Sequence, residues 1–336
     1  ISLEPEEALP DDFFTKAAEV REFTPFVETI PGTSVSFKML PIPGGTFYMG
    51  SPEGEPGRDE SEGPQRNIEI SPFFMAEVEV TWEMYLAFFR ETVSEGRSIA
   101  SAGVVADRAL GVDAISGPTP PWGAPDQGWG WGNRPAITMT FHAAQVFCQW
   151  LSQKTGKTYR LPTEAEWEFA ARGGTVTPYF FEGNPRRFTH RSFWNQVFGP
   201  DTTLINSYVI FGGNSRGKTQ PPEDVRPNPF GLKNMVGNVW EFVSDYFASN
   251  ILKQYPEGET VINPTGPITG QERVIRGGSF RSDAFEVRSA TRSHTRHDQW
   301  LRTDPQIPKS TWWYSDVVDV GFRVVMEWTP PNQSNN

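Results

Sequence analysis

Two carboxylates with the spacing of a catalytic pair stand out in this sequence. Glu164 and Glu168 lie four residues apart in the stretch RLPTEAEWEFAARGG, so a helix there carries both on one face. Paired carboxylates can act as general acid and base. Acidic residues in the first turn of a helix also stabilise it through the helix dipole. We favour this structural role, and the acid–base site stays the alternative.

The histidines and the cysteine offer little metal or redox chemistry. His294 and His297 lie three residues apart and could share a helical face, but Arg292 and Arg296 alternate with them and would repel a cation. We therefore expect no metal there. The single thiol, Cys148, excludes an intrachain disulfide, a CxxC pair and a cysteine-based zinc site.

The elements around these residues can be predicted from their ends. Thr163 and Glu166 form a T-x-x-E capping box, so a short helix starts after Thr163 and ends at Gly173. This is the helix that carries the two carboxylates. Thr81 is an N-cap before WEMYLAFFRET, whose large apolar residues fall on one face.

A further helix is predicted after Thr140, in FHAAQVFCQWLSQKTGK. Its apolar stripe consists of Phe141, Ala144, Cys148 and Leu151, and Gly156 stops it. Cys148 is therefore expected to be a small buried hydrophobe rather than a reactive thiol. His142 lacks a second ligand one turn away, so we expect it to be structural.

The patterning divides the chain into three parts. Residues 1–33 are acidic and proline-containing, and we interpret them as an N-terminal extension. From Ser34, SVSFKMLPIPGGTFYMG alternates apolar and polar residues, which is typical of paired strands. The domain is predicted over 34–328, followed by a tail, 329–336. Within it, residues 98–135 form an insertion rich in Trp, Gly and Pro.

Two loop segments contain residue types that are common in ligand-binding loops. The acidic stretch EGEPGRDESE, residues 53–62, lacks the alternating ligands of an EF-hand, so a solvated loop is the favoured interpretation. The glycines of GWGWG do not match GxGxxG between a strand and a helix, so no phosphate site is expected.

Composition excludes several classes of protein. The 336 residues carry 30 Lys and Arg against 41 Asp and Glu, a net charge of −11, which is unsuited to general nucleic-acid binding. With 31 Gly, 30 Pro and 12 Trp, a loop-rich fold with buried rings is expected. No apolar run is long enough to span a membrane, although a lipid anchor stays possible. Because the sequence begins at Ile1, we expect a processed chain that is periplasmic, outer-membrane-associated or extracellular.

Seven sequence blocks occur in the order typical of one family. They are LPIPGGTFYMG, EVEVTWEMYLAFF, RLPTEAEWEFAARGG, NPFGLKNMVGNVWEF, RVIRGGSF, RSATR and GFRVV. In this order they resemble the formylglycine-generating enzyme, or sulfatase-modifying factor, family from about Ser34 to Met326. The resemblance implies an α+β fold, an elaborated C-type-lectin-like single domain with little regular secondary structure.

The resemblance also implies the loss of the family's oxidation chemistry. Enzymes of the family bind copper(I) with two cysteines in the segment after RGGS, and thiolates are the natural ligands of this soft ion. These positions are Ser282 and Val287 here, so we expect no copper. Trp240 and Ser279 match residues that line the family's pocket. The pocket is therefore expected to persist as a vestigial one, with no catalytic residue.

Calcium is the cofactor that the resemblance leaves in place. The family binds one Ca²⁺ through an Asn side chain, two backbone carbonyls and a Glu, which correspond to Asn234, Gly237, Val239 and Glu241. The alternative is that Glu241 pairs with a buried arginine. A second family site corresponds to Asn206, Ser207 and Asn214, where an Asn replaces a carboxylate, which should weaken binding.

Five arginines in these blocks have two possible roles. Arg273, Arg276, Arg288, Arg292 and Arg323 could recognise an anionic ligand, but pairing with buried carboxylates is the favoured prediction. The iron-dependent sulfoxide synthases of the family need a separate helical domain with three histidine ligands. We find no room for it before Ser34, so this activity is not expected.

The function that follows is a non-catalytic family member, a pseudoenzyme that acts as a binding or scaffold subunit of a cell-envelope or extracellular assembly. Such members are similar to lipoprotein components of gliding-motility and secretion machinery, so the expected partners are other protein subunits. The insertion 98–135 and the Trp-rich stretch 297–316 are the predicted contact surfaces. An enzyme with non-copper chemistry and a lectin-like ligand-recognition module are the alternatives.

Overall fold

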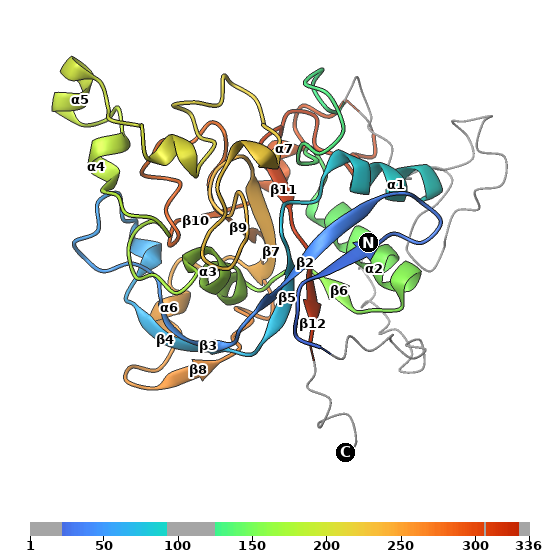
Figure 1. Ribbon diagram of the computed structural model, residues 1–336, viewed down its shortest axis with the longest axis horizontal. Helices are drawn as coiled ribbons and strands as arrows, with labels where there is room; N and C mark the ends of the chain where they lie inside the picture. Colours follow the sequence, from blue (N-terminus) through green and yellow to red (C-terminus); the bar gives the residue numbers. More distant parts are fainter. Residues whose placement is uncertain (1–21, 93–124, 306, 329–336) are drawn as a thin grey trace.

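The computed structural model describes residues 22–92, 125–305 and 307–328. Short helices and three separate sheets are joined by long loops, as the Gly and Pro content predicts (Figure 1). The helices are α1 (Trp82–Thr92), α2 (Phe141–Thr155), α3 (Glu164–Arg172), α4 (Pro185–Phe188), α5 (Phe193–Phe198), α6 (Ile251–Gln254) and α7 (His297–Trp300). None in the described parts is long and apolar enough to cross a membrane.

The sheets bring together segments that are far apart in the sequence. The first has the order β1 (Phe26–Thr29), β2 (Ser36–Ile42), β5 (Phe73–Ala76), β12 (Val325–Glu327) and β6 (Tyr159–Arg160). The second has the order β10 (Arg292–His294), β9 (Arg273–Arg276), β7 (Trp240–Tyr246) and β11 (Val320–Phe322). The third contains β3 (Gly45–Met49), β4 (Arg66–Ile70) and β8 (Thr260–Ile262).

The folded domain begins before Ser34, where we predicted its start. Strand β1 pairs antiparallel with β2, from Phe26 opposite Met39 to Thr29 opposite Ser36. Phe23 packs edge-on against Phe74, with ring centroids 5.1 Å apart. The boundary was placed too late because the strand is short and only one of its residues is buried. Residues 1–21, 329–336 and most of the 98–135 insertion lie outside the described residues.

The predicted helix ends are confirmed. The Thr140 side chain accepts a hydrogen bond from the N–H of Ala143, and Gly156 ends α2 with φ +69°. Thr163 and Glu166 form the expected capping box of α3, which ends at Gly173 with φ +56°. Local sequence chemistry therefore determines where these helices start and stop.

Two buried clusters form the core. One surrounds α1 and α2 and contains Cys148, and the other surrounds α3. Trp312, Trp313 and Tyr314 are at most 2% exposed in the first cluster. The prediction that the 297–316 stretch presents its rings as a contact surface is therefore wrong for these three, because they fill the core between sheet and helices.

A buried carboxylate holds the start of α3 against β7. Oδ2 of Asp245 accepts hydrogen bonds from the backbone N–H of Glu164 at 2.8 Å and from the Ser244 hydroxyl at 3.2 Å. Burial, and then the negative charge of Glu164, raise the pKa of Asp245 to about 7. The helix is thus capped by a group that binds a proton more tightly in the folded state than in the unfolded one.

This predicts a pH-dependent effect of Asp245→Asn. Because the unfolded pKa is about 3.9, the wild-type carboxyl loses stabilisation as the pH rises from about 4 to about 7. The amide in the variant does not titrate, so this loss of stabilisation between about pH 4 and about pH 7 does not occur. We expect its free energy of unfolding, relative to wild type, to rise by about 2 kcal/mol between pH 5.5 and pH 8. Urea denaturation at both pH values measures this, and an equal difference at both would contradict the assignment.

Candidate functional site

Three of the four predicted pocket residues line one cavity of about 520 Å³. Trp240 begins β7, whereas Ser279 and Ser282 follow the turn after β9. Val287, the fourth predicted residue, does not line the cavity and is fully buried in the core around α3. The structure therefore brings three of the four together.

Two positive-φ glycines bring the β9 turn close to its neighbours. Gly277 and Gly278 have φ of +95° and +75°, where other residues are strained. A Cβ on Gly278 would lie 2.7 Å from the carbonyl oxygen of Glu286 and 2.8 Å from Cγ1 of Val287. The RGGS segment can therefore pack directly on Val287 and present Ser279 and Ser282 to the cavity.

The cavity contains a serine–aspartate pair. The Ser279 hydroxyl donates a hydrogen bond to Oδ2 of Asp319 at 3.1 Å, and the Ser279 N–H donates to Oγ of Ser282 at 3.0 Å. Burial raises the pKa of Asp319, and the charge of Arg281 opposes this rise. No histidine or cysteine is among the described residues that line the cavity, so Ser279 has no imidazole base to activate it.

The two positions that the resemblance assigns to copper ligands carry no sulfur. Ser282 uses its hydroxyl to accept a backbone hydrogen bond, and Val287 places an isopropyl group in the core. Cys148 lies on α2 in the aromatic core, where burial raises the pKa of its thiol. The expected role of Cys148 as a buried hydrophobe agrees with this placement.

The predicted calcium ligands lie around a buried arginine. Both carboxylate oxygens of Glu241 accept from Arg323, each at 2.7 Å, and Nη2 of Arg323 also contacts the Asn234 carbonyl at 3.3 Å. Glu241 therefore makes the arginine pair that was its alternative role. Gly237 and Val239 lie between Asn234 and Glu241 in the sequence.

One observation at this site favours a cation. Oδ1 of Asn234 is buried without a hydrogen-bond partner, and its backbone has φ +51°. Glu79 lies beside it, and burial, opposed by Arg323 and assisted by Glu241, raises the pKa of Glu79 to about 7. Two buried carboxylates thus share one arginine. The unpartnered amide oxygen of Asn234 fits a hard cation, whereas Glu241 would have to share its oxygens with Arg323.

The residues of the second predicted site are also close together. The Asn214 amide donates to Oδ1 of Asn206 at 3.1 Å and to the carbonyl of Val209 at 2.8 Å. Ser207 follows Asn206 in a short 3₁₀ turn. Because an N–H of Asn214 points at the oxygen that would bind the ion, this arrangement is less suited to calcium than an aspartate would be.

The other chemically interesting side chains have structural partners. His294 contacts the Thr295 carbonyl through Nδ1 at 2.6 Å, and Nδ1 of His297 lies 2.8 Å from the Tyr314 hydroxyl. The His142 ring packs edge-on against Trp312. In residues 22–92, 125–305 and 307–328, no three His, Cys, Asp or Glu side chains form a group that could hold a metal ion.

The paired carboxylates of α3 are bound by buried arginines. Arg292 binds both oxygens of Glu164, at 2.6 and 2.9 Å, and Arg276 contacts Glu168 at 2.6 Å. Burial would raise the pKa of Glu164, but the charges of Arg292 and Arg276 outweigh it and hold the pKa below its usual value. The dipole interpretation was incomplete because it omitted these partners, which lie more than 100 residues away.

The five arginines that could have bound an anion are used within the domain. Arg273 stacks over Tyr246, with its guanidinium carbon 3.4 Å from the ring centroid. The other four make buried ion pairs, namely Arg276 with Glu168, Arg288 with Glu62, Arg292 with Glu164 and Arg323 with Glu241. Their favoured structural role agrees with these contacts.

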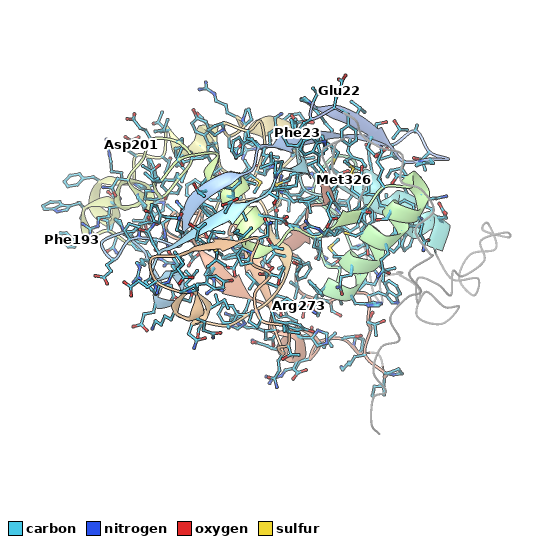
Figure 2. The ribbon with its side chains drawn as sticks, turned by 90° about the horizontal axis from the view of Figure 1, so that it is seen from below. Glu22, Phe23, Phe193, Asp201, Arg273 and Met326 are labelled. Carbon is cyan, nitrogen blue, oxygen red and sulfur yellow. The ribbon has the colours of Figure 1, made fainter. Side chains whose placement is uncertain are left out.

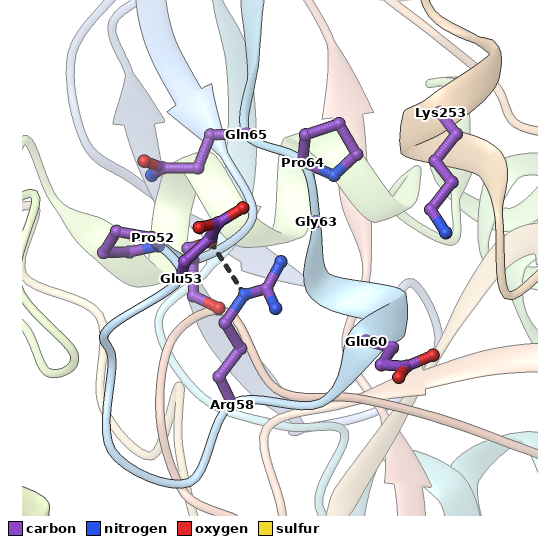
Figure 3. A pocket seen from close by; sticks show the side chains of 9 residues that line it. Pro52, Glu53, Arg58, Glu60, Gly63, Pro64, Gln65 and Lys253 are labelled. Atoms are coloured by element: carbon purple, nitrogen blue, oxygen red, sulfur yellow. Dashed lines mark hydrogen bonds between the residues drawn. The ribbon is translucent and has the colours of Figure 1, made fainter.

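The acidic stretch 53–62 is not a solvated loop throughout. Glu55 and Glu62 are 8% and 1% exposed, and both contact Arg288, which is fully buried. The prediction failed because Arg288 is more than 200 residues away in sequence. Glu53 and Glu60, by contrast, line a second cavity of about 510 Å³ together with Arg58 and Lys253 (Figure 3). Charges of both signs alternate there.

Comparison with known proteins identifies the fold family. The sequence model described as the sulfatase-modifying factor enzyme 1-like domain matches residues 29–302, most of the chain. The chain belongs to the sulfatase-modifying factor family. Formylglycine-generating enzyme of Mus musculus is 30% identical over 286 residues, which cover 78% of this chain and 72% of that protein. The predicted formylglycine-generating-enzyme-like α+β domain is thereby confirmed.

Relatives in this family include proteins named as enzymes and proteins named as inactive. A Bos taurus protein named inactive C-alpha-formylglycine-generating enzyme 2 is 31% identical over 237 residues, covering 64% of this chain and 73% of that one. The structure of PvdO from Pseudomonas aeruginosa matches with a TM-score of 0.61 and 25% identity over 90% of this chain and 98% of that one. Membership of the sulfatase-modifying factor family is therefore compatible with loss of the enzymatic reaction.

Sequence reasoning missed Asp319 and Arg281 as cavity residues. Asp319 immediately precedes β11, which pairs with β7, so it reaches Ser279 only through tertiary structure. Arg281 follows RGGSF and is exposed at the cavity. Its place two residues after Ser279 was the available signal.

Arg288 provides a test of the buried pairs under the cavity. In Arg288→Met, the carboxylates of Glu55 and Glu62 lose their partner inside the protein, and we expect a loss of 3 to 5 kcal/mol, about the range for broken buried pairs. Arg191 lines the same cavity and pairs with Glu286, but is 57% exposed. Arg191→Met is the matched control and should cost less than about 1 kcal/mol. Denaturant unfolding measures both losses. If the two variants lose the same free energy of unfolding, burial does not make the Arg288 pairs more important than the exposed pair.

Proposed function

We propose that this chain is a non-catalytic member of the sulfatase-modifying factor family, and that it acts as a binding or scaffold subunit of an assembly in the cell envelope or outside the cell. The observation that carries the proposal is the state of the two copper-ligand positions. Ser282 and Val287 offer a hydroxyl and a buried isopropyl group, neither of which can hold a soft ion. The cavity nevertheless persists.

The cavity is suited to an anionic group of the partner. Arg281 and Arg296 are exposed at its wall, and neither makes an ion pair within the described residues, although Asp59 and Asp319 also line the cavity. Their neighbours Arg288 and Arg292 are committed to buried carboxylates. Since guanidinium groups bind carboxylates in a bidentate manner, an acidic peptide segment is the partner chemistry that this wall favours.

Two measurements test the proposal. We expect no aldehyde when the protein is incubated with copper, oxygen and a sulfatase-derived cysteine peptide, under conditions in which a formylglycine-generating enzyme converts it. We also expect tagged protein to copurify with a companion in equal amount from native envelope extract. Arg281→Glu or Arg296→Glu should lose most of the companion, because the charge at the wall is reversed.

Arg226→Glu is the control for these charge reversals, since Arg226 is exposed and does not line the cavity. It should keep the companion. Aldehyde formation would establish an enzyme instead, and a companion that survives both cavity variants would remove the cavity from the binding surface.

Calcium is proposed as a structural ion at Asn234 and Glu241. The buried, unpartnered Oδ1 of Asn234 supports this proposal, because a hard cation would satisfy it. The ion would bind Asn234, Glu241 and the carbonyls of Gly237 and Val239, and would contribute folding stability rather than chemistry.

Calcium should therefore raise the thermal unfolding midpoint. At a hundredfold excess over its dissociation constant the gain is about 2.7 kcal/mol, which corresponds to several degrees. Asn234→Gly tolerates the left-handed backbone and removes the oxygen, so it should abolish the shift. Asn263→Gly, at another positive-φ asparagine, is the matched control and should retain it. If wild type shows no shift, pairing with Arg323 is the whole role of Glu241.

A further inference from the structure

Helix α5 exposes a cluster of large apolar side chains. Phe193, Trp194, Val197 and Phe198 are 69%, 67%, 61% and 77% exposed, and no residue of the helix is buried. We call these four residues the α5 tip. In Figure 1 the helix projects from the body, and in Figure 2 the labelled Phe193 points away at one end of the molecule.

The helix is held in this position by polar contacts. The Asn195 amide donates to the carbonyls of Arg186 and Thr189, both at 2.8 Å. The Thr189 hydroxyl in turn donates to Asp283 at 2.7 Å, on the segment that follows β9. Polar groups thus attach the helix to the domain, and its large apolar side chains belong to neither buried cluster.

The tip residues form one surface. At 100° per residue, positions i, i+1, i+4 and i+5 fall within an arc of about 140° on a helix. The Trp194 and Phe198 rings stack with centroids 6.2 Å apart, and Phe193 meets Trp194 edge-on at 5.6 Å. A contiguous exposed apolar surface of this kind marks a contact with something outside the chain.

The segment that carries the tip has charges of both signs. Residues 183–200 contain three Arg and one His, and Glu182 and Asp201 flank them. Arg187 and Arg191 reach Asp201 and Glu286, while Arg186 is exposed and makes no ion pair with any described residue. Among the described residues, Arg186 is therefore the arginine beside the tip that is available to an anionic partner.

We propose that the α5 tip binds an anionic lipid bilayer, with its rings in the headgroup–acyl boundary. Phe and Trp on one face and arginines beside them are typical of interfacial helices. A convex tip can enter a flat lipid surface, and Arg186 beside it would meet anionic headgroups there. This proposal does not depend on the occupant of the cavity.

Vesicle flotation with the full chain tests the proposal. Wild type should float with vesicles of phosphatidylcholine and phosphatidylglycerol, and less with phosphatidylcholine alone. Trp194→Ser with Phe198→Ser should lower partitioning at least tenfold, because the inserted rings are lost. Arg186→Gln should lower it about fivefold on the anionic vesicles only, the effect of about one basic residue near the surface. Both variants change exposed side chains, so their unfolding midpoints should match wild type.

Val176→Ser with Ile268→Ser is the matched control, since these apolar residues are 76% and 94% exposed elsewhere. It should float like wild type. The proposal is overturned if wild type floats with neither kind of vesicle. It is also overturned if the Trp194 and Phe198 double variant floats as wild type does. Lipid-free self-association that this double variant abolishes would also overturn it, because the tip would then bind a second copy of the chain.

Discussion

Buried arginine–carboxylate pairs connect the segments of this domain. Arg276 donates to Glu168 and to the carbonyls of residues 289–291, while Arg172 donates to the same Glu168 and to the Gly50 carbonyl. One carboxylate thus joins α3, β9 and the loop after β3. Many loop backbone groups bond to one another, and each buried guanidinium adds up to five donors in a fixed geometry. A buried charge is costly when unpaired, so each pair stabilises one arrangement of the loops against others.

These pairs also mark the limit of what the sequence predicts. The capping box at Thr163 and the stop at Gly156 depend on neighbours within a few residues, so they could be identified in advance. The burial of Glu62 depends on Arg288, 226 residues away. Charged residues between glycines look solvated until that partner is known. The burial of Trp312 and the exposure of Trp194 show the same limit. Amino-acid composition does not determine which aromatic rings are buried and which are exposed.

The cavity walls are held by contacts that need no sulfur at the two positions assigned to copper ligands. The β9 turn is shaped by Gly277 and Gly278, and Ser279 is held by Asp319 and by the oxygen of Ser282. Val287 packs against Gly278 as any small apolar residue would. Ser282 and Val287 therefore support the walls through a hydroxyl and an isopropyl group. This explains physically how a frame of the sulfatase-modifying factor type can keep a cavity while lacking thiolates, and why resemblance in fold says little about activity.

Two side-chain contacts connect the segment before the α5 tip to the chain that lines the cavity. Arg191 lines the cavity and lies two residues before Phe193, and its pair with Glu286 joins this segment to the chain after the β9 turn. Thr189 and Asp283 make a second link between the same two segments. The tip therefore has a defined orientation relative to the cavity. With its rings in a bilayer, the chain would present the cavity beside the lipid surface, where its exposed arginines would meet an acidic segment of a membrane-associated protein rather than one free in solution.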